Sequence, residues 1–80
     1  MRSEKEPVLR ANRYRYNFDR MVYYNRTAKK AFSVEWLEDH TDDDLKRALA
    51  ERNETNGWKI YMDARPSQAV IDAFLAEVNG

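Results

Sequence analysis

Apolar residues occupy every second position in three stretches of the chain, and this alternation is the period of a β-strand. The second stretch contains Phe32, Val34 and Trp36, and the third runs over residues 58–63. Polar residues 25–30, between the first two stretches, predict a β-hairpin with a longer loop. The first stretch runs over residues 13–24, with these side chains expected on one face: Tyr14, Tyr16, Phe18, Val22 and Tyr24.

Two other stretches have the spacing of helices. Thr41 can cap the first amides of a helix over residues 41–54, and Asp44, at the third helical position, can reach back to the cap. Residues 65–67, Arg-Pro-Ser, are expected to begin a second helix, because Pro is accepted in a first turn. Its apolar stripe is formed by Val70, Ile71, Phe74, Leu75 and Val78.

The order strand, strand, helix, strand, helix predicts an α+β fold. We expect a two-layer sandwich: a mainly antiparallel sheet of three or four strands, with two helices packed on one face. The other face of such a sheet is left to solvent or to a partner. Residues 1–12 mix charges around Pro7 without a period, which predicts a flexible N-terminal arm before a single domain over residues 13–80.

Composition excludes several classes of protein. The chain has 80 residues and no cysteine, so it cannot be a disulfide-stabilised secreted mini-protein. No stretch approaches the roughly 20 apolar residues that a membrane-spanning helix needs, and no signal peptide is recognisable at residues 1–7. We therefore expect a cytoplasmic protein without membrane contact.

Charge is divided along the chain although the total is zero. The first 32 residues carry nine Lys or Arg and three Asp or Glu, whereas the last 48 carry five and eleven. The basic part also holds six of the ten aromatic residues. Such polarity bears on partners and on encounter rates rather than on the fold.

Residues for catalysis are scarce. His40, the single histidine, lies between Asp39 and Asp42, but consecutive Asp side chains on a helix diverge by about 100° each, so helix capping explains them better than a metal site does. Gly57 and Gly80 are the only glycines, which excludes glycine-rich phosphate loops. We expect no enzyme, no cofactor and no bound metal.

Arginine alternates with tyrosine in the first strand, a composition also found where sheets bind single-stranded nucleic acid. Alternation places Arg13 and Arg15 opposite Tyr14 and Tyr16, so that one ligand would not easily meet both sets. The rings can instead line the core while the arginines protect an edge strand, or the segment can contact a protein.

Carboxylates are dense over residues 35–44, and closely spaced carboxylates can imitate a row of phosphates in the basic groove of another protein.

Aromatic residues are more numerous than a core of this size can bury. Tyr23 and Tyr61 are expected on the face opposite the inward set of their strands, where a partner or a second copy of the chain could bind.

These features favour a small non-enzymatic protein that binds a macromolecular partner stoichiometrically, using the outer sheet face and one charged pole. A protein or ribonucleoprotein complex that handles nucleic acid fits best, with the chain as a regulator or inhibitor of the phage or mobile-element kind, such as anti-CRISPR proteins. The alternative is direct nucleic-acid binding through the basic first strand; a homodimer is also possible. The candidate partner-binding residues are Arg10, Arg13, Arg15, Arg20, Tyr23, Tyr24, Glu35, Trp36, Glu38, Asp39, Asp42, Asp43 and Tyr61.

Overall fold

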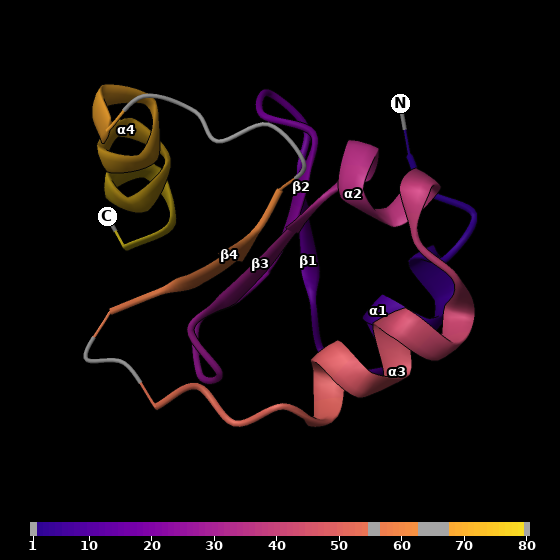
Figure 1. Cartoon of the computed structure of the whole chain (residues 1–80). Coiled ribbons are helices and arrows are strands. Elements are labelled where there is room, and N and C mark those ends of the chain that lie inside the picture. The colour runs from indigo at the N-terminus through magenta and orange to yellow at the C-terminus, as the bar shows by residue number, and fades with distance from the viewer. Residues whose placement is uncertain (1, 55–56, 63–67, 80) are drawn as a thin grey trace.

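The computed structural model describes residues 2–54, 57–62 and 68–79. Its helices and strands follow one another as α1 (Glu6–Ala11), β1 (Arg15–Asn17), β2 (Val22–Asn25), β3 (Lys30–Ser33), α2 (Val34–Asp39), α3 (Asp42–Ala50), β4 (Lys59–Tyr61) and α4 (Gln68–Asn79). The four strands form one sheet in the order β1-β2-β3-β4 (Figure 1). The predicted α+β class is confirmed. The expected helix start at residues 65–67 lies outside the described residues.

The sheet is mixed rather than mainly antiparallel. β1 pairs with β2 and β2 with β3 in antiparallel hairpins, but β4 lies parallel to β3. The reason is the connection: α2 and α3 carry the chain from the end of β3 back to the level of its start before β4 begins (Figure 1). A crossover of this length permits parallel pairing, which a short hairpin does not.

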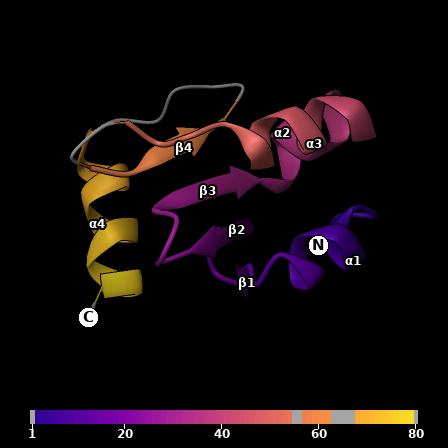
Figure 2. The same cartoon turned by 90° about the horizontal axis from the view of Figure 1, so that it is seen from below.

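Helices cover both faces of the sheet, so the expected placement of the helices on one face is wrong. Figures 1 and 2 show α4 on one side and α1, α2 and α3 on the other. The register gives the cause. Tyr16 pairs with Tyr23 across β1 and β2, and cross-strand neighbours share a face, so the four-residue turn exchanges even and odd positions between the strands. Val22 and Tyr24 therefore face α4, whereas Tyr23 faces the other helices.

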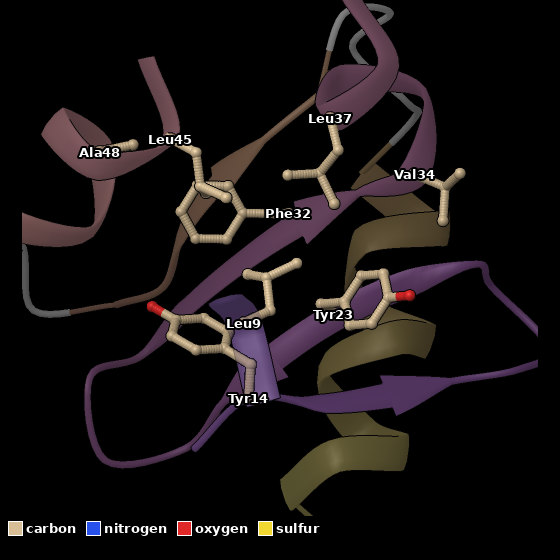
Figure 3. Close-up of a cluster of buried hydrophobic side chains, with 8 residues drawn as sticks. All are labelled: Leu9, Tyr14, Tyr23, Phe32, Val34, Leu37, Leu45 and Ala48. Atoms are coloured by element: carbon tan, nitrogen blue, oxygen red, sulfur yellow. The ribbon is translucent and has the colours of Figure 1, made fainter. Parts of the chain in front are cut away.

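The larger core cluster surrounds Phe32, which is completely buried (Figure 3). The ring of Tyr61 stacks on it at a centroid distance of 4.4 Å and an interplanar angle of 7°, and the ring of Tyr14 lies 5.6 Å away. The four strands each contribute one ring to a row on which α1, α2 and α3 pack: Tyr16, Tyr23, Phe32 and Tyr61. The other core side chains are Leu9, Val34, Leu37, Leu45 and Ala48.

Residues 2–12 pack on the domain, in place of the expected flexible arm. Leu9 of α1 is completely buried in the larger cluster. The Tyr23 hydroxyl accepts a hydrogen bond from the Ser3 amide at 3.0 Å and donates one to a Glu6 carboxylate oxygen at 2.8 Å. Pro7 in the first turn is compatible with the helix, because a first-turn amide needs no intrahelical acceptor.

Helix α2 replaces the second half of the expected second strand. Ser33 ends β3 and caps α2, because its hydroxyl accepts a hydrogen bond from the Trp36 amide at 3.0 Å. Val34 and Leu37, three residues apart, then place their side chains in the core. The alternation of Phe32, Val34 and Trp36 predicted a strand that includes all three residues. The strand instead ends at Ser33 and includes only Phe32.

Helix α3 begins as predicted, and a lysine side chain donates hydrogen bonds to the carbonyls at its C-terminal end. Thr41 and Asp44 form a reciprocal capping box with two hydrogen bonds of 3.1 Å. At the other end, the buried Lys30 ammonium donates to the carbonyls of Ala48 at 2.8 Å and Leu49 at 3.3 Å, and also to that of Glu51. A cation there satisfies carbonyls that have no partner within the helix.

Stability should fall at alkaline pH because two tyrosines are buried. Burial raises the pKa of both Tyr14 and Tyr23 to about 12, whereas an unfolded tyrosine has a pKa of about 10. Between about pH 10 and pH 12 the unfolded chain releases these protons while the folded chain keeps them, so the free energy of unfolding falls by about 1.4 kcal/mol per pH unit for each ring. Urea unfolding at several pH values measures this slope. Tyr14→Phe should lose about half of it, and a constant stability from pH 9 to 12 would contradict the prediction.

Candidate anion-binding pocket

The aromatic candidates are mostly part of the core. Tyr23 is completely buried, and Tyr61 is half-buried against Phe32 with its hydroxyl donating to Glu51 at 3.0 Å. Trp36 is half-buried between Phe32 and His40, whose ring stacks on the indole at 3.9 Å. The expectation of an outward-facing Tyr23 and Tyr61 is therefore wrong, because both faces of the sheet are covered.

The acidic candidates lie on α2 and at the start of α3. Glu35, Glu38 and Asp39 are exposed on α2, and Asp42 and Asp43 are exposed in the first turn of α3, where they favour the positive end of the helix dipole. The only ion pair that the described residues form with any of these five is a 4.0 Å contact between Lys5 and Asp42. They form an exposed, solvated surface.

His40 contacts Trp36 through both a hydrogen bond and its ring. Its Nδ1 lies 2.7 Å from the Trp36 carbonyl oxygen, and its ring is stacked on the indole. Within residues 2–54, 57–62 and 68–79, no three His, Asp or Glu side chains converge as metal ligands.

The basic candidates divide between two places. Arg20 lies in the β1–β2 turn and forms an ion pair with Glu77 of α4 at 3.4 Å. Arg13 and Arg15 instead line a pocket of about 420 Å³ at the other end of this hairpin, which we call the arginine pocket. Arg10 lines a smaller neighbouring hollow of about 220 Å³, which Arg15 also borders. The residues of the arginine pocket are Arg13, Arg15, Tyr24, Asn25, Arg26, Thr27 and Ala28.

Strand register brings an arginine and a tyrosine together in this pocket. Arg15 of β1 pairs directly with Tyr24 of β2, so both side chains project from the face that α4 covers. Helix α4 contacts this face through Glu77, which meets Asn17 and Arg20, and through Phe74, which meets Tyr24. Arg15 is exposed, and none of the described residues that line the pocket comes from α4. Alternation within β1 does separate Arg15 from Tyr16, but the neighbouring strand supplies another ring.

Arg13 is placed by the end of α1. The Tyr14 amide donates to the Leu9 carbonyl at 2.9 Å and the Arg13 amide to the Arg10 carbonyl at 3.0 Å, which is the hydrogen-bond pattern of a Schellman motif. Arg13 occupies the left-handed position of this motif with a φ of 67°. Glycine is favoured there, and an arginine costs about 1 kcal/mol of backbone strain. Such strain outside glycine is common at functional positions.

Asn25 joins the two walls of the arginine pocket. Its side-chain oxygen accepts a hydrogen bond from the Ala28 amide at 2.9 Å and so shapes the β2–β3 turn. Its side-chain nitrogen donates to the Asn12 carbonyl at 3.2 Å, which ties this turn to the end of α1. Arg26 in the turn is thereby held near Arg13 and Arg15.

The positive charge of the arginine pocket is not neutralised within the described part of the chain. Arg13, Arg15 and Arg26 are exposed, and none forms an ion pair with a described residue. Arg2, by contrast, forms an ion pair with Glu6 at the start of α1, and Arg47 forms one with Asp44 within α3. The described residues that line the pocket include no Asp or Glu. This arrangement suits an anionic ligand, because three like charges remain close together only at a cost.

Four residues of this site were not predicted from the sequence: Asn25, Arg26, Thr27 and Ala28. The signal was the predicted hairpin itself: residues 25–30 form its loop, and pairing β2 with β1 brings the start of that loop beside Arg13 and Arg15. The observed register was needed to recognise this, because the alternation over residues 13–24 predicted one continuous face, whereas the turn between β1 and β2 exchanges the two faces.

Comparisons with protein-family models, with curated proteins and with solved structures gave no match to this chain. Within the residues that the structure describes, no helix combines the length and the apolar character needed to cross a bilayer.

Proposed function

We propose that the protein is a small non-enzymatic binding protein that acts stoichiometrically on a nucleic-acid-handling complex in the cytoplasm, as its regulator or inhibitor. The arginine pocket is the surface with which it contacts the nucleic acid of that complex. The observation that carries this proposal is the convergence of Arg13, Arg15 and Arg26 on one pocket without an acidic partner among its described residues. Phosphates are the anions that arginine groups bind most readily by paired hydrogen bonds.

The exposed carboxylates of α2 add a second surface to this proposal. β3 separates the β2–β3 turn, which borders the arginine pocket, from Glu35, Glu38 and Asp39 on α2. A nucleoprotein complex presents both phosphates and the basic protein surface that holds them. The two charged ends of this domain complement those two components, and a domain bound in this way excludes other basic surfaces from the same phosphates.

Direct titration with nucleic acid tests the proposal. We expect labelled single strands to bind with an affinity that falls with salt, and three phosphate contacts correspond to a slope of about −2 in a plot of log affinity against log salt concentration. Arg15→Ala should weaken binding several-fold and reduce the magnitude of the slope by about 0.7. Fluorescence anisotropy at a series of salt concentrations measures both quantities.

Arg47→Ala is the matched control, because it removes the same charge from α3 on the opposite face of the sheet. We expect it to bind as the wild type does. The proposal would be refuted by an absence of binding to single strands and duplexes at low salt. Equal losses in Arg15→Ala and Arg47→Ala would refute the arginine pocket as the site.

A further inference from the structure

We infer that the arginine pocket binds single-stranded nucleic acid, with phosphates on Arg13, Arg15 and Arg26 and one base stacked on the ring of Tyr24. This rests on the proposed function, because it names the form of nucleic acid that the pocket takes. The pocket contains the ring of Tyr24 beside its arginines, and an anion bound by charge alone would not need a ring.

Tyr24 is shared between the core and the arginine pocket. One side of its ring belongs to the cluster beneath α4, where it meets Phe74 edge-on at a centroid distance of 6.2 Å and an angle of 80°. The residue is only half-buried, and its remaining surface lines the pocket. Phe74 thus fixes the orientation of a ring that is still accessible to a ligand, and a ring already held in place stacks on a base with little further loss of entropy.

The pairing of Tyr24 with Arg15 matches the two ends of a nucleotide. Directly opposed residues on neighbouring strands have Cβ atoms roughly 5 Å apart, so a ring and a guanidinium stand side by side on this face. A base can stack on the ring while its phosphate meets the guanidinium. Arg13 and Arg26 lie on the pocket walls, where they can receive the neighbouring phosphates.

A duplex would leave the ring unused. Its bases are stacked on one another and expose only their edges, whereas the bases of a single strand offer their faces to aromatic side chains. An acidic peptide would pair with the arginines but would gain nothing specific from Tyr24. The combination of three arginines with one oriented ring therefore favours a single strand over both.

The test compares tyrosine and arginine variants on four probes: a 12-residue oligothymidylate, a 12-residue oligouridylate, a duplex of the same length and inorganic polyphosphate. Tyr24→Leu, which retains an apolar contact for Phe74, should weaken binding of both single strands roughly tenfold and leave polyphosphate binding unchanged. Tyr24→Phe keeps the ring and should bind as the wild type does. Arg15→Ala should weaken all four. Circular dichroism of each variant checks that it is folded.

The outcomes separate this inference from the proposed function. Equal binding of single strands by Tyr24→Leu and the wild type, with a loss in Arg15→Ala, would overturn the stacking inference and leave the proposed function standing. Tighter binding of the duplex than of either single strand would also overturn it. Binding of polyphosphate in place of every nucleic acid would overturn both.

Discussion

Leu9→Ala is expected to lower the free energy of unfolding by about 2 to 5 kcal/mol, a large share of the total for a domain of this size. Leu9 is completely buried, and its side chain lies with Tyr14 and Phe32 in the larger core cluster (Figure 3). Removing three carbons from this position leaves a cavity that the strands around it cannot fill without moving. Urea unfolding followed by circular dichroism gives the change.

Val8→Ala is the matched control, because Val8 precedes Leu9 in the same helix but is 37% exposed. We expect it to change stability by less than about 1 kcal/mol. Similar small effects of the two substitutions would mean that residues 2–12 contribute little to the domain, as the sequence analysis expected of a flexible arm. A large difference between them would place α1 in the folding unit.

Combining Arg13→Gly, Arg15→Ala and Arg26→Ala is expected to weaken single-strand binding by on the order of 100-fold or more without lowering stability. Each guanidinium that meets a phosphate contributes a charge-assisted hydrogen bond, and a several-fold loss of affinity at each of the three positions multiplies to about 100-fold. All three side chains are exposed, so their removal leaves no cavity. Anisotropy titration gives the affinity and thermal unfolding gives the stability.

The choice of glycine at position 13 separates binding from folding. Arg13 has a φ of 67°, so Arg13→Gly should raise the free energy of unfolding by about 1 kcal/mol, whereas Arg13→Ala keeps the strained backbone and should not. Both single variants lose the same guanidinium and should lose the same affinity. If the Gly variant were stabilised and bound as the wild type does, Arg13 would not belong to the binding surface.

Elements with local signals were predictable from the sequence. The helix beginning at Thr41 depends on a cap and a carboxylate three residues apart, and both act as predicted. β4 follows from alternation around Ile60. Helix α1 carried a weaker signal, with Pro7 in its first turn and one core residue, and a helix of six residues shows too few turns for a period to be visible.

The faces of the sheet and the composition of the arginine pocket could not be predicted in the same way. They depend on the register of β1 and β2, which pairs Tyr16 with Tyr23 and Arg15 with Tyr24. A shift of one residue would send each of these side chains to the other face. The buried Lys30 is similarly non-local, because it is stabilised by carbonyls about 20 residues away at the end of α3.

Titration of the ¹⁵N-labelled protein with a single-stranded oligonucleotide, followed by amide chemical shifts, is the most direct measurement of where a ligand binds. We predict that the largest shifts fall on Arg13, Arg15 and residues 24–28, with little change along α2 and α3. Shifts centred on Glu35, Glu38 and Asp39, or no shifts at low salt, would contradict the arginine pocket as the functional surface of this protein.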